Sequence, residues 1–318
     1  MATLRIPELL AFFAIYVIWG STYLAIRHAV ETIPPLMTAG IRHLAAGLII
    51  FLWARRGKPR VTAAEWRASV VVAVLFFLIG HGTLHWAEQT VPSGIAALLV
   101  ATEPFWIALL MPAAQGSRFS WRMAAGLAAG LFGVALLVPR DMLTAGAGEL
   151  WGSTAILVGT MSWALGIRYS STAPLPRDPF VRAGTTLLCG AALLLPASLL
   201  TGEVARVELQ AISARSIASL AYLIICGSVV AFSAYFWLLE RRSATLVATH
   251  TYVNPVIAVL LGWLAGGELL TLQIGWATAL ILAAVFILKS DAERRGAAPA
   301  IVGKENQLPP TLRGIRVR

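Results

Sequence analysis

Long apolar runs separated by short polar loops make up almost the whole of this chain. An α-helix needs about 20 apolar residues to cross the hydrocarbon core of a bilayer. On that template the chain divides into ten predicted spans. They are residues 7–28, 34–54, 68–87, 92–113, 120–139, 149–170, 179–200, 214–238, 244–265 and 270–289. The pattern therefore predicts an all-α integral membrane protein with ten transmembrane helices.

The apolar pattern also occurs twice. Residues 34–47 align with residues 178–191 at a shift of 144, and the same shift places Trp19 on Trp163. Two five-helix repeats are therefore expected. Because five is an odd number, the second repeat would insert upside down relative to the first. Such inverted-topology repeats are typical of secondary transporters, with a substrate site near mid-membrane.

The repeats set the predicted domain boundaries. The first five-helix repeat covers residues 1–142 and the second covers residues 143–290. Residues 291–318 are polar, basic and proline-containing, which predicts a disordered cytoplasmic tail.

Positive charge is concentrated in the even-numbered loops and in the tail. The loop 55–67, for example, holds five lysines and arginines. Basic loops stay on the cytoplasmic side, so both termini are expected there. The net charge of +10 therefore reflects membrane orientation and, without interleaved aromatic residues, does not favour nucleic-acid binding. Composition agrees, because 58% of the residues are hydrophobic and 13% are charged.

Several function classes lack their motifs. The sequence has no P-loop, so this chain would not use ATP to drive transport. All three aspartates fall in predicted loops, so the paired intramembrane acids of a prenyl-transferring enzyme are missing. The two cysteines lie in apolar runs and indicate no disulfide framework. No catalytic set, cofactor or metal site is predicted.

Ionisable residues inside predicted spans are the main candidates for function, because charge in lipid is costly. Glu103 lies in the fourth span beside Pro104, and a shift of 151 places this pair on Asn254 and Pro255. Glu103 could contact a substrate amine or carry a proton. Alternatively, it is a protonated structural acid bonded to a carbonyl that Pro104 frees.

Arg42 lies about eight residues into the second span. Its guanidinium could bind a substrate carboxylate in fork geometry. The alternatives are a structural ion pair with Glu31 or Glu88, or a side chain that extends to the outer interface.

Three histidines complete the polar candidates. His81 and His85 share a helical face with Glu88, which favours a polar cavity wall. This trio lacks a further ligand for a metal site. His250 precedes Asn254 by one helical turn and receives the same interpretation.

Deep aromatic residues could line the same cavity. Trp19, its repeat partner Trp163, and Tyr23 would suit apolar or cationic solutes, the latter through cation–π contacts. Packing is the alternative for each ring.

Four segments carry a family resemblance: IWGSTYLAIR (18–27), PPLMTAGIRHLAAG (34–47), AEQTVPSGIAALLVATEP (87–104) and YVNPVIAVLLGWLAGGELLT (252–271). With the duplicated layout, they resemble the drug/metabolite transporter superfamily, EamA-type, closest to its YedA-like branch. The resemblance implies ten helices, an inner-membrane location and export of small metabolites or drugs through a central cavity. It also implies that the fifth and tenth spans are peripheral.

Together these observations favour a secondary exporter that moves a small amphipathic metabolite, amino acid or drug by alternating access. The alternatives are an uncoupled facilitator of small-solute diffusion and an integral membrane enzyme. The expected partners are a small-molecule substrate and the lipid bilayer, with protons as a candidate coupling ion and a monomer or weak homo-oligomer as the assembly.

Overall fold

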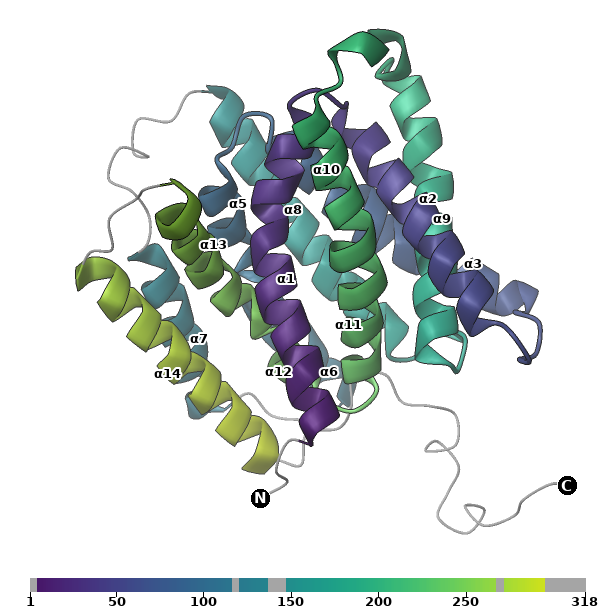
Figure 1. Ribbon diagram of the computed structural model, residues 1–318. Helices are drawn as coiled ribbons and strands as arrows, with labels where there is room; N and C mark the ends of the chain where they lie inside the picture. Colours follow the sequence, from purple (N-terminus) through teal and green to yellow (C-terminus); the bar gives the residue numbers. More distant parts are fainter. Residues whose placement is uncertain (1–4, 116–119, 137–146, 267–271, 295–318) are drawn as a thin grey trace, which may run out of the picture.

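The computed structural model describes residues 5–115, 120–136, 147–266 and 272–294, and every regular element in these ranges is helical (Figure 1). The all-α prediction is therefore confirmed for the described residues. The α-helices are α1 (Ile6–Val30), α2 (Pro35–Ala54), α3 (Ala63–Ala73), α4 (Gly82–Ala87), α5 (Ser93–Val100), α6 (Glu103–Gln115), α7 (Trp121–Ala135), α8 (Ala147–Ser170), α9 (Pro179–Leu200), α10 (Ala214–Tyr222), α11 (Ala231–Leu239), α12 (Ala244–Val247), α13 (His250–Gly266) and α14 (Leu272–Arg294).

Two of these helical runs contain π-helical turns. Val74–His81 joins α3 to α4, and Leu223–Val230 joins α10 to α11, so each run is continuous. A π-helical turn bonds each N–H to the carbonyl five residues back, which alters the phase of the helix and is frequent at functional sites.

Helices occupy all ten predicted ranges. Among the described residues, 6 are continuous, long and apolar enough to cross a membrane. They are Ile6–Val30, Pro35–Ala54, Ala63–Ala87, Gly148–Ser170, Pro179–Leu200 and Ala214–Leu239. The full count of ten crossings stays a prediction. The first residues of the predicted tail, 291–294, belong to α14, and the rest of that tail lies outside the described residues.

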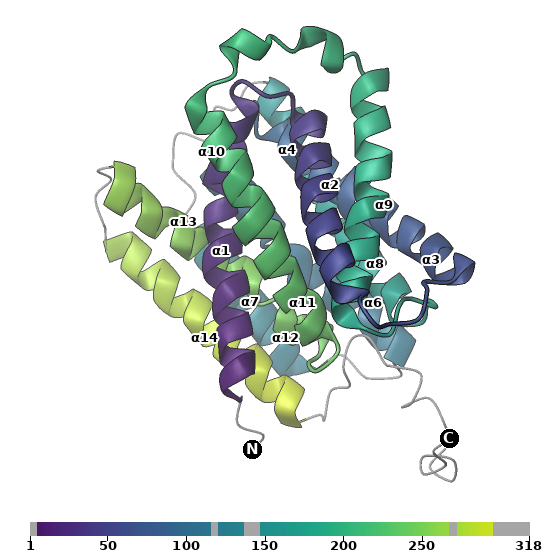
Figure 2. The same cartoon turned by 45° about the vertical axis from the view of Figure 1, so that its right-hand side comes forward.

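The helices form one bundle (Figure 2). α1 packs against α13 and α11, α2 packs along α9, and α7 pairs with α14 at one side of the bundle. Glycines allow the close approach of α2 and α9. A Cβ added at Gly184 would lie 2.8 Å from the backbone of Phe51, and one added at Gly47 would lie 2.9 Å from the nitrogen of Leu188. Small residues at such contacts are the usual basis of helix packing in lipid.

The fourth and ninth predicted spans are each broken into two helices in the structure. α5 ends at Val100 and α6 begins at Glu103. Pro104 accounts for this break, because a proline has no N–H to donate and its ring clashes with the carbonyl four residues earlier, here that of Val100. The break between α12 and α13 comes before Pro255, and α13 continues across that proline.

Both breaks contain the same four residues, LVAT. In each, the threonine hydroxyl donates to the leucine carbonyl: Thr102 to Leu99 at 2.8 Å and Thr249 to Leu246 at 2.6 Å. Each threonine also meets a neighbouring helix. Thr102 lies 3.4 Å from the hydroxyl of Thr160 in α8, whereas Thr249 lies 2.7 Å from that of Tyr16 in α1.

The positions of these breaks change which residues of the first half of the chain correspond to which residues of the second half. Glu103 is the first residue of α6 and His250 is the first residue of α13, so the structure matches Glu103 with His250. The sequence comparison matched it with Asn254 instead, because it aligned the helix starts and the prolines. α5 has 8 residues and α12 has 4, and this difference of about one turn accounts for the disagreement.

One prediction concerns the start of α9. Asp178 caps this helix, since its Oδ1 accepts from the amides of Phe180 and Val181, both at 3.0 Å, and its other oxygen pairs with Lys58. Partial burial works to raise the pKa of Asp178, but the bonds from Lys58 and the two amides outweigh it and hold the pKa below 3.8. Replacing Asp178 by alanine should lower the free energy of unfolding by about 1 kcal/mol.

The lowered pKa of Asp178 determines how its contribution to stability changes with pH. The contribution of Asp178 is present above the pKa of the unfolded chain and is lost as the pH falls through the folded-state pKa. Thermal unfolding in detergent, compared between neutral and acidic pH, measures both effects. Asp178→Asn is the control, since it keeps the cap without the charge. An alanine variant as stable as the parent at neutral pH would contradict the assignment.

Candidate functional site

A cavity lies among α1, α2, α4, α5, α6, α8, α13 and the π-helical turn Val74–His81, and it holds about 610 Å³ of empty space, counting the part that opens to solvent. Its lining consists of Trp19, Thr22, Tyr23, Ile26, Arg42, Gly80, His81, Leu84, Val100, Glu103, Ile156, Gly159, Thr160, Trp163, His250 and Asn254.

Two helices, α1 and α8, each line the cavity with one side over two helical turns. α1 contributes Trp19 and the residues three, four and seven positions after it. α8 contributes Trp163 and the residues three, four and seven positions before it. That spacing is one side of an α-helix. The opposite order reflects opposite chain directions, because the two helices run antiparallel past the cavity (Figure 1).

Eight of the nine predicted site residues line the cavity. They are Trp19, Tyr23, Arg42, His81, Glu103, Trp163, His250 and Asn254. The exception is His85, which is buried outside the lining, with its Nδ1 2.8 Å from the carbonyl of His81. His85 lies in α4, one α-helical turn beyond His81, and Leu84 is the last residue of this helical run in the lining.

Hydrogen bonds to the second half of the chain hold the side chain of Arg42 in place. Its Nε donates to Ser228 Oγ at 2.7 Å and its Nη2 donates to the Gly227 carbonyl at 3.2 Å. Both acceptors lie in the π-helical turn Leu223–Val230. The side chain is only 1% exposed, which excludes extension to an interface. Among the described residues, no ion pair within 4.0 Å involves Arg42, and its Nη1 has no hydrogen-bond partner.

Glu103 and Asn254 supply the acceptors. Glu103 opens α6 and is 3% exposed, and within the described residues its Oε1 has no hydrogen-bond partner. A helix N-terminus favours a carboxylate electrostatically. Asn254 Oδ1 is also buried and has no partner in the described part of the chain. Within the described residues, the side chains that line the cavity thus include one donor nitrogen and two acceptor oxygens without a hydrogen-bond partner.

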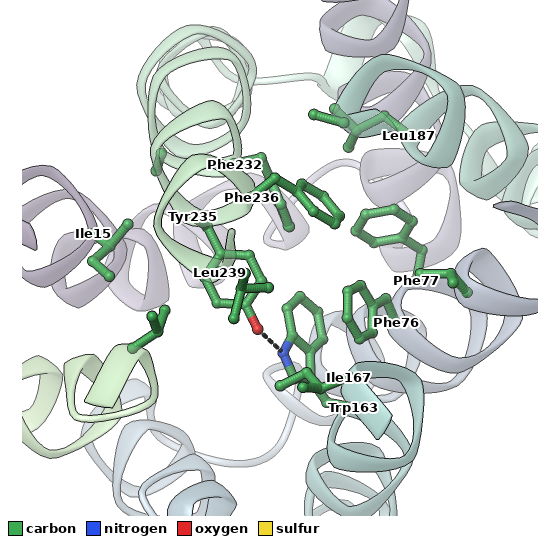
Figure 3. Close-up of a cluster of buried hydrophobic side chains, with 14 of the residues drawn as sticks. Ile15, Phe76, Phe77, Trp163, Ile167, Leu187, Phe232, Tyr235, Phe236 and Leu239 are labelled. Atoms are coloured by element: carbon green, nitrogen blue, oxygen red, sulfur yellow. Dashed lines mark hydrogen bonds between the residues drawn. The ribbon is translucent and has the colours of Figure 1, made fainter. Parts of the chain in front are cut away.

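Tryptophan rings form the apolar wall. Trp19 and Trp163 meet edge to face, with ring centroids 6.4 Å apart and planes at 89°. Each indole N–H is anchored: Trp19 donates to the Gly227 carbonyl at 3.0 Å, and Trp163 donates to the hydroxyl of Tyr235 at 3.0 Å. Figure 3 shows the second bond. Anchored rings keep a fixed orientation toward a bound solute.

Buried aromatic residues close the cavity toward the end of the bundle where α1 begins. Phe76 stacks on Trp163 at 4.1 Å, and Phe77 and Phe232 pack beside it, as Figure 3 shows. Ion pairs beyond them tie the helix ends together. They are Lys58–Asp178, Arg182–Glu240 at 2.9 Å and Arg242–Glu8 at 2.7 Å.

Sequence reasoning missed some participants. Thr22 and Thr160 line the cavity one helical turn from the two tryptophans, so the spacing around Trp19 and Trp163 could have identified them. His43 is an ionisable residue of the second predicted span and was also missed; it lies behind the lining and contacts the cavity residue His81.

Comparison with known proteins gives the family. Residues 6–138 and 150–290 both match the EamA-like transporter family. The inner membrane transporter YedA of Escherichia coli K12 is 38% identical over 289 residues, covering 89% of this chain and 90% of that protein. A protein of the same organism named "Probable amino-acid metabolite efflux pump" is 27% identical over 278 residues, covering 81% of this chain and 86% of that protein.

A solved crystal structure shares the fold. It superposes with a TM-score of 0.72 at 21% sequence identity, covering 92% of this chain and 100% of that chain. The family resemblance drawn from the sequence is thus confirmed, and with it the assignment as a membrane transporter. The chain belongs to the EamA-like transporter family.

Proposed function

We propose that this transporter exports a small amphipathic metabolite with an amino-acid headgroup, by alternating access through the central cavity. The unsatisfied polar groups of the cavity carry the proposal. Arg42 Nη1 can bind a carboxylate, while Glu103 Oε1 and Asn254 Oδ1 can accept from an ammonium group. The tryptophan wall suits an apolar side chain.

The broken helices support this mechanism. Glu103 and His250 each begin a half-helix in the interior of the bundle, and discontinuous helices of this kind form substrate sites in many secondary transporters. The shared LVAT breaks and the two π-helical turns favour two inverted five-helix repeats, residues 1–142 and 143–290. Ten crossings with both termini in the cytoplasm of the cell are part of the proposal.

The end of the cavity near the start of α1 is closed, which supports a direction of transport. Aromatic packing and ion pairs seal the cavity where α1 begins, which the basic loops mark as the cytoplasmic side. The state described would therefore face outward, and export requires these ion pairs to open and re-form. The name of the E. coli efflux relative agrees with an amino-acid-like substrate.

Proteoliposomes provide the test. Vesicles containing the purified protein would be loaded with labelled L-leucine, L-phenylalanine or L-cysteine and diluted into unlabelled buffer, with and without an imposed pH gradient. We expect efflux well above that of protein-free vesicles, accelerated by a gradient acting as proton antiport. Efflux that ignores the gradient would indicate an uncoupled facilitator. Failure to move any of these amino acids would contradict the proposed substrate class, and a chemically altered product would indicate an enzyme.

A further inference from the structure

Two histidines, one behind the cavity wall and one on it, have tautomers that their hydrogen bonds determine when the rings are neutral. His43 in α2 is fully buried, and its Nδ1 lies against the carbonyl oxygen of Ala39. A carbonyl only accepts hydrogen bonds, so Nδ1 of His43 must carry the hydrogen. The neutral ring then presents Nε2 as an acceptor.

That acceptor determines the tautomer of the next ring. His81 Nδ1 lies 3.1 Å from His43 Nε2. Since Nε2 of His43 accepts, Nδ1 of His81 donates and carries its hydrogen. Nε2 of His81 is left with a free lone pair. No described residue bonds to it, and His81 lines the cavity.

Packing holds both rings in place. His81 stacks on Trp163, with centroids 5.3 Å apart and planes at 22°, and Phe232 lies 5.6 Å away. His43 meets Phe77 edge to face at 4.4 Å. A ring enclosed in this way cannot turn over without disturbing its neighbours, so the lone pair keeps its direction.

We propose that His81 is a specificity-determining residue whose Nε2 accepts a hydrogen bond from the ammonium group of the substrate. His43 is a positioning residue that holds His81 in the accepting tautomer. The inference rests on the proposed function and names the chemical class at this site: a primary amine, as distinct from the corresponding alcohol.

The surrounding charges agree with this assignment. An ammonium group has three N–H donors, and His81 Nε2, Glu103 Oε1 and Asn254 Oδ1 supply three acceptors around one cavity. Arg42 is the cation of the lining, so it repels the ammonium and attracts the carboxylate. A hydroxyl analogue offers one donor and no charge, and a site built for a charged donor rejects such an analogue strongly.

The tautomer can be measured without any substrate. The chain contains five histidines, so nitrogen-15 NMR of histidine-labelled protein in lipid nanodiscs resolves few signals. The variants His81→Gln and His85→Gln each remove one signal and so assign the signals of these two histidines. We expect His81 to carry its hydrogen on Nδ1 in the parent protein and to populate both tautomers in His43→Phe. A His81 ring protonated on Nε2 in the parent would overturn the proposal.

Transport tests the selectivity. The probes are L-leucine and its 2-hydroxy analogue, and the readout is the ratio of their kcat/KM values in proteoliposomes. His81→Phe should reduce the preference for leucine about tenfold to a hundredfold, the range expected for a hydrogen bond to a charged group. His81→Gln, which retains a carbonyl acceptor, should recover part of it, and His43→Phe should lose part.

His85→Gln is the matched control. His85 lies one turn from His81, also donates from Nδ1 to a backbone carbonyl, and does not line the cavity. Its substitution should leave the preference unchanged. If the parent transports leucine and His81→Phe keeps the full preference, this inference is wrong while the proposed function stands. If the parent transports neither probe, the proposed function fails first.

Discussion

Replacing Arg42 by lysine should raise the KM for a carboxylate-bearing substrate about tenfold to a hundredfold and leave the fold intact. Arg42 uses Nε and Nη2 to bond Ser228 and Gly227, which leaves Nη1 for the substrate. A lysine keeps the charge but has one nitrogen, so it cannot hold both anchors and also reach the cavity. The loss of one charge-assisted hydrogen bond, about 1.5–3 kcal/mol, sets the size of the effect.

The fold should survive because lysine fills the same position and one of the two abandoned acceptors keeps another partner. The Gly227 carbonyl still accepts from the indole N–H of Trp19. Thermal unfolding of Arg42→Lys in detergent checks this point.

Concentration-dependent efflux of L-leucine and L-leucinamide from proteoliposomes measures the prediction. The amide lacks the carboxylate, so its KM should not change. Arg168→Lys is the matched control, since Arg168 donates to the carbonyl of Leu110 and does not line the cavity. An unchanged KM for leucine in Arg42→Lys would mean that Arg42 serves only to hold α2 against the π-helical turn.

The position of the cavity could be predicted from the sequence because lipid makes polar residues conspicuous. Arg42, Glu103 and His250 stood out in apolar runs, and all three line the cavity. Trp19 and Tyr23 were proposed as deep aromatic residues, and their spacing of four positions places them on one face of α1. These signals are local, and an α-helix converts sequence spacing into direction reliably.

The contacts that organise the cavity could not be predicted in this way. Arg42 and its anchor Gly227 are 185 positions apart, and the anchor depends on a π-helical turn that leaves no mark in the apolar pattern. His85 was assigned to the cavity from its spacing to His81, but it is buried outside the lining. Aligning the prolines pairs Glu103 with Asn254, whereas aligning the starts of α6 and α13 pairs it with His250, one turn earlier, because α5 and α12 differ in length.

The second large effect concerns Glu103. Replacing it by glutamine should abolish the acceleration of efflux by a pH gradient, while exchange of leucine across the membrane without a gradient continues. Glutamine keeps the size and the hydrogen-bonding oxygen of glutamate but cannot bind and release a proton. Because the residue lines the cavity with an unsatisfied oxygen, a proton and a substrate ammonium would compete for the same carboxylate. Such competition at one site is sufficient for antiport.

Glu88→Gln is the control that distinguishes proton coupling at Glu103 from the effect of removing any buried carboxyl group. Glu88 is also a buried carboxyl, 1% exposed, but it lies outside the lining of the cavity. The response of efflux to the gradient, measured at equal protein content in the parent and both variants, should therefore disappear in Glu103→Gln and persist in Glu88→Gln. A response that survives in Glu103→Gln would assign the coupling proton to another group. His250, which opens the corresponding half-helix and lines the same cavity, would then be the next residue to replace, because it is the structural counterpart of Glu103.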